Sequence, residues 1–139
     1  MPAKVFVDSN IWLYSLIQSE GDDRHQQAVD ILIQLDCPVI NSQVIREICN
    51  NLKKKTGLSE EQLRSLIHGW YQDCNVVHSN ESQHLLASRL RNSYSFSYWD
   101  SLIVAAALDA SCAMLYSEDM QHGQVIDGSL TILNPFLKQ

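Results

Sequence analysis

The chain has 139 residues, 45% of them hydrophobic, and its formal net charge is -6. This length predicts a single domain over residues 1–139, and the hydrophobic content argues against a disordered chain. The acidic balance argues against a protein that binds nucleic acid through general positive charge alone. It leaves room for an enzyme that uses a local basic patch or bound cations.

The four cysteines are far apart and form no CxxC pair, so neither a zinc knuckle nor a disulfide framework is predicted. They are Cys37, Cys49, Cys74 and Cys112. We expect reduced, mostly buried thiols, as in cytosolic proteins. MPAK leads directly into the apolar run VFV without a signal peptide, and no apolar stretch nears the roughly 20 residues that span a bilayer. A cytoplasmic protein with no membrane partner is therefore expected.

Strands and helices are predicted to alternate along the chain. The predicted strands cover residues 4–7, 38–40, 75–78, 113–116 and, as a possible fifth, 130–133. The predicted helices cover residues 10–18, 23–35, 42–55, 80–93 and 97–111, and a further helix, the fourth in chain order, opens at residues 59–62. Ser42 is expected to cap the third helix, and Ser59-Glu60-Glu61-Gln62 forms a capping-box pattern before the fourth.

This alternation predicts an α/β fold with three layers, in which helices cover both faces of a mostly parallel sheet of four to five strands. In such sheets, functional sites form outside the carboxyl ends of the strands. Polar residues that follow the predicted strands are therefore the first candidates for a site.

Asp8 directly follows the apolar run VFV, at the carboxyl end of the first predicted strand. Because Asp is a favoured N-cap, Asp8 could simply accept backbone N–H bonds from the next helix. A carboxylate has two oxygens, so capping and a functional role are compatible.

Asp100 lies in an almost entirely apolar helical segment, YWDSLIVAAAL. Helical spacing places it on one face with Ile103, Val104 and Ala107. A buried carboxylate is costly unless it is paired, hydrogen-bonded or bound to a metal. The alternative is that Ser97 and Asp100 form a variant of the capping box, which involves no chemistry.

Three further acids are weaker candidates when each is taken alone. Glu118 and Asp119 follow the predicted strand at 113–116, where adjacent acids are often a solvated loop. Glu47 flanks the apolar stripe of its helix, where a glutamate is usually a surface residue. Whether these three acids are functional depends on whether they lie close to Asp8 and Asp100 in the folded protein.

Clustered carboxylates repel one another, so they need cations between them. Oxygen-only ligands favour hard ions such as Mg²⁺ or Mn²⁺, and no competing set of His and Cys ligands is present. Such ions can activate water and stabilise the leaving oxygen when a phosphodiester is cleaved. The acids together therefore predict metal-dependent phosphodiester hydrolysis.

Four segments in this order resemble the PIN-domain family, in particular the VapC-type toxin ribonucleases of toxin–antitoxin systems. They are VFVDSNIWLY, NSQVIREICNNL, YWDSLIVAAAL and LYSEDMQHGQ. The resemblance covers nearly the whole chain. It implies a PIN-like fold, an acidic site that binds Mg²⁺ or Mn²⁺ and hydrolyses RNA, a homodimer, and a cognate antitoxin that masks the site.

By motif position, the resemblance assigns four catalytic acids: Asp8, Glu47, Asp100 and Asp119. The metal ligands it implies are Asp8, Asp100 and Asp119, with Glu47 completing the site or positioning water. Asp119 is preferred to Glu118 because the fourth acid of the family follows a small hydroxyl residue by two positions.

The resemblance also assigns supporting roles around these acids. Ser9 and Asn10 match the polar pair after the first acid. Asn10 could bond the carboxylates or a metal-bound water, or be an ordinary residue at the start of a helix. Ser117 could orient an acid or merely cap a turn. His122 stands where many members carry an aromatic residue; it could contact phosphate or be an ordinary loop histidine.

Contact with RNA requires cationic groups, and Lys53, Lys54 and Lys55 form the densest cluster. The same lysines could instead interact with the helix dipole at the end of the third predicted helix. Further candidates are Arg89 and Arg91. Four aromatic residues could be core or could stack on bases, with core expected for most. They are Trp12, Tyr14, Trp70 and Trp99.

The leading hypothesis is a metal-dependent endoribonuclease toxin. The second is a catalytically silent PIN-like module that binds RNA or a protein partner. The third is a receiver-type or phosphatase-like α/β domain, which would need a late lysine, and the chain offers only Lys138.

Overall fold

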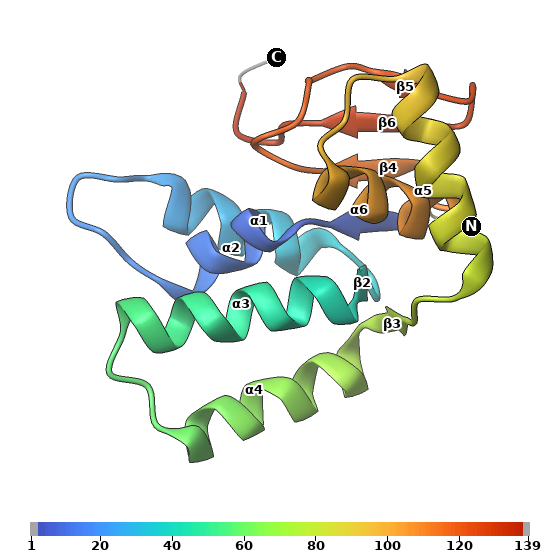
Figure 1. Cartoon of the computed structure of the whole chain (residues 1–139). Helices are drawn as coiled ribbons and strands as arrows, with labels where there is room; N and C mark the ends of the chain where they lie inside the picture. The colour runs from blue at the N-terminus through green and yellow to red at the C-terminus, as the bar shows by residue number, and fades with distance from the viewer. Residues whose placement is uncertain (1–2, 138–139) are drawn as a thin grey trace.

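The structure is a computed structural model that describes residues 3–137, so Lys138 lies outside the described residues. Six strands form one sheet in the order β3-β2-β1-β4-β6-β5 (Figure 1). Their bounds are β1 Val5–Val7, β2 Val39–Asn41, β3 Asn75–Val77, β4 Met114–Tyr116, β5 Val125–Ile126 and β6 Leu130–Leu133. Every neighbouring pair is parallel except β5 and β6. The predicted mostly parallel α/β fold is confirmed, with one more strand than expected.

Six helices connect and cover the strands among the described residues. They are α1 Ser9–Leu16, α2 Arg24–Gln34, α3 Ser42–Lys55, α4 Glu60–Asp73, α5 Glu81–Ser93 and α6 Tyr98–Asp109. The crossovers from β1 to β2 and from β2 to β3 run toward one edge of the sheet, and the crossover from β3 to β4 returns past β1. Because parallel crossovers are right-handed, this reversal places α1–α4 on one face and α5 and α6 on the other.

The reversal also makes β1 and β4 neighbours at the centre of the sheet. Their carboxyl ends are joined by a hydrogen bond of 2.9 Å, which the backbone N–H of Asp8 donates to the carbonyl of Tyr116. In open α/β sheets, ligand sites form at the point where the strand order reverses. The topology therefore directs attention to the residues that follow β1 and β4.

The core explains why these segments form their elements. Phe6 and Val7 of β1 are fully buried, as expected for a central parallel strand covered on both faces. Helix α6 is buried almost continuously from Ile103 to Ala107, which confirms that its apolar sequence belongs to the core. Trp12 and Trp70 are also buried and meet edge to face, with their ring centroids 6.5 Å apart.

The helix caps differ from the prediction at one position. The expected cap at Ser42 is wrong, because Ser42 is already the first residue of α3. Asn41 caps this helix, and its Oδ1 accepts from the Val44 N–H at 2.9 Å. Asn and Ser are comparable caps, so the local sequence does not separate them. The capping box at Ser59 and Gln62 is confirmed, with both of its hydrogen bonds present.

The additional strand is β5, which pairs with β6 in an antiparallel hairpin. Asp127 and Gly128 in the turn have positive φ angles of 52° and 69°. The Ser129 N–H closes the turn on the Ile126 carbonyl at 3.0 Å. An Asp-Gly pair with positive φ is typical of tight hairpin turns, although β5 has only two residues and shows no alternating pattern.

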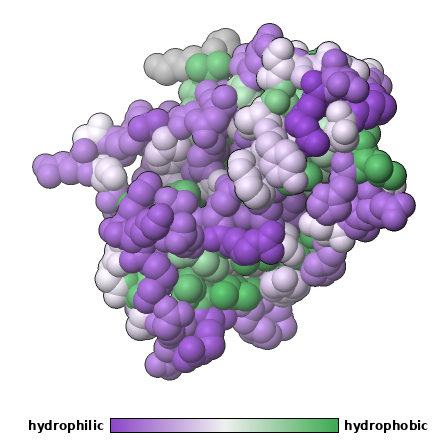
Figure 2. Space-filling view, viewed as in Figure 1, coloured by the Kyte–Doolittle hydropathy of each residue, from purple (hydrophilic) through white to green (hydrophobic). Residues whose placement is uncertain are grey.

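The face shown in Figure 2 is mainly hydrophilic, with a hydrophobic strip between α3 and α4. A hollow of about 540 Å³ lies there, and its apolar lining comes from Leu16, Leu52, Leu58 and Leu66. Among residues 3–137, none of the helices combines the length and apolar character needed to cross a membrane.

The four cysteines are free thiols, and they are less uniformly buried than predicted. Cys74 and Cys112 are buried, Cys49 is half-buried, and Cys37 is exposed. Cys37 lies in the connection before β2 and adopts a positive φ of 52°, so its position in a turn accounts for its exposure.

Candidate active site

Asp8 is held between the ends of β1 and β4. It caps α1, since its Oδ1 accepts from the Ser9 N–H at 2.8 Å. Its Oδ2 accepts from the hydroxyl of Ser117, which follows β4, at 2.9 Å. Both Asp8 and Ser117 are buried, with exposed fractions of 7% and 0%. Asp8 is therefore a helix cap that is also fixed by a residue 109 positions later in the chain.

The surroundings of Asp8 disfavour its charged form. Burial is the main cause that raises its pKa, from 3.8 to about 6, and the hydrogen bonds from Ser9 and Ser117 oppose this rise. Repulsion from the carboxylates of Glu47 and Asp100 raises the pKa further. Two more acids thus lie near enough to Asp8 to act on it electrostatically.

Glu47 reaches this edge from α3, where it is half-buried. Its Oε2 accepts from the Ser9 hydroxyl at 2.6 Å, and its Oε1 accepts from the Gln43 side-chain amide at 3.0 Å. The first of these bonds ties α3 to the residue that follows Asp8. Glu47 is consequently a fixed part of the cluster, although its sequence position alone allowed a surface role.

Asp100 and Asp119 complete the group of acids. Asp100 lies in the first turn of α6, which Ser97 caps by accepting from the Asp100 N–H at 3.1 Å. Burial is the main cause that raises the Asp100 pKa, and repulsion from Asp119 and Glu47 adds to it. Asp119 is exposed and accepts from the Asn10 side-chain amide at 3.1 Å.

The structure therefore gathers the four predicted acids at one edge of the sheet, where Asp8, Glu47 and Asp119 accept hydrogen bonds from neutral donors. These donors are Ser9, Asn10, Gln43 and Ser117. Within residues 3–137, no group of three or more His, Cys, Asp or Glu side chains is arranged closely enough to hold a metal ion. Like charges repel, which favours carboxylates that stand beside one another without converging.

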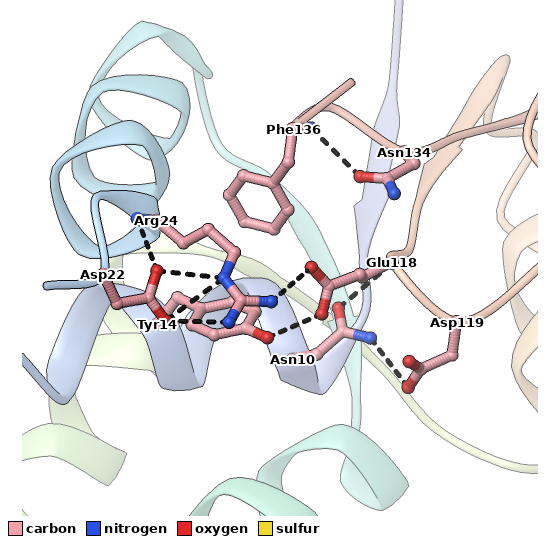
Figure 3. Close-up of polar contacts among 8 residues, drawn as sticks. All are labelled: Asn10, Tyr14, Asp22, Arg24, Glu118, Asp119, Asn134 and Phe136. Atoms are coloured by element: carbon pink, nitrogen blue, oxygen red, sulfur yellow. Dashed lines mark hydrogen bonds and ion pairs between the residues drawn. The ribbon is translucent and has the colours of Figure 1, made fainter. Parts of the chain in front are cut away.

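Glu118 lies next to Asp119 but makes different contacts (Figure 3). Its Oε1 accepts from the Tyr14 hydroxyl at 2.6 Å, and its Oε2 pairs with Arg24 at 3.0 Å. Arg24 lies over the Tyr14 ring at 4.4 Å and also pairs with Asp22 at 2.8 Å. The Glu118 side chain is thus directed toward α1 and the start of α2, away from Asp119.

This network changes the ionisation of its members. Hydrogen bonds from Arg24 lower the pKa of Asp22 to about 2. Burial and the hydrogen bond to Glu118 raise the pKa of Tyr14 to about 12. Tyr14 and Arg24 were not predicted as neighbours of the site, because their contacts with Glu118 join residues that are 104 and 94 positions apart in the chain.

Asn10 joins the network to the acids. Its Nδ2 donates to Asp119, and its Oδ1 accepts from the Glu118 backbone N–H at 3.4 Å. A single side chain on α1 therefore contacts two successive residues of the segment that follows β4. This agrees with the expectation that Asn10 bonds the carboxylates.

The lysine cluster divides into members with different surroundings. Lys53 pairs with Glu60 at 2.7 Å and donates to the Leu58 carbonyl, so it is already engaged within the fold. Lys55 instead lines a hollow of about 210 Å³ together with Asn10 and Tyr14. Lys55 is therefore the member of the cluster that shares a hollow with Asn10, the residue that donates to Asp119.

The remaining candidate contacts have partners inside the molecule. Arg89 pairs with Asp127, and Arg91 donates to the Ser101 hydroxyl at 2.7 Å. His122 accepts a hydrogen bond at Nδ1 from a backbone N–H, that of Asn134, at 2.9 Å. These contacts favour structural roles for all three side chains.

The chain was compared with protein-family models and with curated proteins. A family model described as PIN domain matches residues 5–126. A search of curated proteins found no match.

Several solved structures are similar over almost the whole chain. A toxin–antitoxin complex from Klebsiella pneumoniae has a chain with a TM-score of 0.71 and 17% identity, covering 96% of this chain and 98% of that chain. VapC20 of Mycobacterium tuberculosis, described as a sarcin-ricin loop cleaving toxin, has a TM-score of 0.66 and 17% identity. The match covers 84% of this chain and 90% of that chain. FitAcB from Neisseria gonorrhoeae has a TM-score of 0.65 and 15% identity, and the match covers 94% of this chain and 97% of that chain. At these identities the likeness concerns the fold alone.

Proposed function

The chain belongs to the PIN-domain family, and we propose that it is a metal-dependent endoribonuclease, the toxin of a type II toxin–antitoxin pair. One observation carries the proposal: four carboxylates from separate parts of the chain lie near one another at the edge where the strand order of the sheet reverses. They are Asp8, Glu47, Asp100 and Asp119. A structural ion-pair network would place cations among these acids, whereas here their partners are neutral donors.

The donor set fits a hard divalent cation. All candidate ligands are oxygens, and Asp8 and Asp100 have pKa values raised by burial and by neighbouring acids, so added positive charge would relieve the repulsion. Asp8, Asp100 and Asp119 would hold Mg²⁺ or Mn²⁺. When bound, such an ion supplies charge neutralisation and Lewis-acid polarisation of the phosphodiester.

The other polar residues position these acids. Ser117 fixes Asp8 from β4, and Asn10 fixes Asp119 from α1. Glu47 is held by Ser9 and Gln43 with its carboxylate beside the acids, where it can complete the site or orient the attacking water. Fixed side chains of this kind lower the cost of arranging the reacting groups.

Binding of the RNA backbone is assigned to the lysines at the end of α3. Lys55 is the best placed, since it lines the hollow next to Asn10. Lys54 is exposed, and Lys53 is partly neutralised by Glu60. A few local cations are sufficient to hold phosphates on a protein whose net charge is negative.

A cognate antitoxin that masks the acids and a homodimer are part of the same proposal. The antitoxin is supported by the fold shared with a chain that was solved in a toxin–antitoxin complex, and the homodimer by the resemblance to VapC-type toxins. The alternative is a catalytically silent PIN module that binds RNA or a protein partner. The presence of all four acids favours the enzyme.

The test is RNA cleavage by the purified protein with Mg²⁺ or Mn²⁺ and with a chelator. Asp8→Asn and Asp100→Asn should each lower the rate by roughly 100-fold or more, because each removes charge from the site. Asp36→Asn, at an exposed position outside the cluster, serves as the matched control. Cleavage by the two site variants at the parental rate would refute the mechanism.

The silent alternative has a separate test. A crystal soaked in Mn²⁺ should show anomalous density beside Asp8, whereas a module without a metal site should show none at high concentration. Light scattering gives the oligomeric state. Co-purification with the product of an adjacent small reading frame tests the antitoxin.

A further inference from the structure

A polar cleft of about 360 Å³ opens beside two of the four acids. It lies between the loop that joins α5 to α6 and the segment that follows β4. Asp100 and Asp119 line one part of it, and Tyr94, Phe96 and Gln124 line another. Its volume is within the range of pockets that hold small organic groups.

The charge of the cleft limits what it can bind. Within residues 3–137, no lysine or arginine contributes to its lining, and its only charged residues are Asp100 and Asp119. A phosphate bound in the part of the cleft away from these acids would therefore have no positively charged side chain to pair with. By contrast, Lys55 lines the separate hollow beside Asn10. The neutral part of the cleft suits an uncharged, flat and polar group.

The aromatic side of the cleft is held in place before any ligand arrives. The Tyr94 hydroxyl accepts from the Asp127 backbone N–H at 3.0 Å and donates to the Asp127 carboxylate at 3.3 Å. Arg89 pairs with the same carboxylate. The rings of Tyr94 and Phe96 lie 5.7 Å apart with a tilt of 38°. Pre-organised walls lower the entropic cost of binding.

Two amide side chains add hydrogen-bonding capacity. Gln121 is exposed and Gln124 is half-buried, and both line the cleft. The backbone of Gln124 is fixed, because its carbonyl accepts from the Ile132 N–H at 2.9 Å. In the part of the chain that the structure describes, neither side-chain amide is engaged in a hydrogen bond. Each offers two donors and an acceptor, the groups that recognise the edges of nucleobases.

We propose that this cleft binds the base of a nucleotide adjacent to the scissile phosphate in single-stranded RNA. Phe96 supplies the stacking surface, and Gln121 and Gln124 determine the preferred base. The inference rests on the proposed ribonuclease function and names the part of its substrate that gives specificity. A paired base cannot enter, since its faces and Watson–Crick edge are already occupied.

The test separates base binding from chemistry. Labelled homopolymers of rA, rC and rU, about 12 nucleotides long to exceed one binding site, report affinity by fluorescence anisotropy in Ca²⁺. Mn²⁺-dependent hydrolysis of bis(4-nitrophenyl) phosphate, which has no nucleobase, reports the acids alone. Phe96→Leu keeps apolar packing without the aromatic face, and a double variant combines Gln121→Ala with Gln124→Ala. Tyr71→Leu and Gln72→Ala, exposed positions on α4, are the matched controls.

Phe96→Leu should weaken binding of the homopolymers by roughly 5- to 150-fold, the range for losing one stacked base. The glutamine double variant should change the ratio of affinities among the three homopolymers by about 5-fold or more. Ester hydrolysis should be unchanged in both, and the controls should bind like the parent.

Parental affinities in both cleft variants would overturn the inference, as would a parent that binds no single-stranded RNA. A parent that binds RNA with these dependences but fails to hydrolyse the ester would support the cleft and contradict the proposed catalysis. The two proposals can therefore fail separately.

Discussion

Replacing Asp8 with asparagine should stabilise the folded protein at neutral pH while removing its response to divalent cations. Asp8 is buried, and two further acids repel its charge. Asparagine keeps a carbonyl oxygen that can accept from the Ser9 N–H, and it has no charge to bury. A residue chosen for function at the expense of stability should behave in this way.

The magnitude follows from the ionisation of Asp8. A rise of its pKa from 3.8 to about 6 corresponds to about 3 kcal/mol of unfavourable free energy for the charged form in the fold. Asparagine replaces the hydrogen bond from Ser117 imperfectly, so a net gain of about 1 to 3 kcal/mol is expected. For a chain of this length, that gain raises Tm by roughly 3 to 9 °C.

The sign of the effect depends on pH. Between pH 3.8 and about 6, the unfolded chain releases the Asp8 proton while the folded protein retains it, so stability falls as pH rises through this window. The asparagine variant lacks this contribution. The difference between variant and parent should therefore be close to zero below about pH 4 and complete above about pH 6.

Chemical and thermal denaturation across this pH range, with EDTA or with Mn²⁺, provides the assay. Mn²⁺ should raise the Tm of the parent and of the Asp36→Asn control, and leave Asp8→Asn unchanged. A variant that is less stable than the parent by the same amount at every pH would refute the reasoning. Such a result would mean that hydrogen bonding, and not buried charge, dominates at Asp8.

Three further predictions concern other positions. Glu118→Gln should cleave RNA within a few-fold of the parental rate, whereas Asp119→Asn should lose roughly 100-fold; equal losses would show that Glu118 belongs to the catalytic set. Lys55→Ala should weaken RNA binding and lower the salt dependence by about one phosphate contact, and an unchanged salt slope would exclude it from the RNA path. Cys37, which is exposed, should react with a thiol reagent before Cys112, since burial raises the pKa of the Cys112 thiol to about 11; mass spectrometry of the partly labelled chain gives the order.

Asp8 and Asp100 could be singled out from the sequence because each conflicts with its surroundings, whereas Glu47 and Asp119 were assigned through the family resemblance. Asp8 interrupts an apolar run, and Asp100 lies on an apolar helix face. Residues that break a local pattern are often functional. The order of the strands could not be predicted in the same way, since the pairing of β1 with β4 joins segments that are far apart in the chain.

The features that the sequence analysis missed depend on tertiary contacts or on equivalent local choices. Arg24 lies beside the site only because the start of α2 lies near the end of β4, where Arg24 forms an ion pair with Glu118. The cap of α3 was assigned to Ser42 instead of Asn41 because two good capping residues are adjacent. Strand β5 exists through its pairing with β6 and not through its own pattern.

The hydrogen bond between Asp8 and Ser117, which spans 109 residues, also has a consequence for biosynthesis. Translation proceeds at about 5 to 20 residues per second, so roughly 5 to 20 seconds separate the synthesis of these two residues. During that interval β1 lacks its neighbour β4, and the first acid has neither Ser117 nor Asp119 beside it. Under the proposed ribonuclease function, this order of assembly leaves the acidic site incomplete while the ribosome is still reading the message that encodes it.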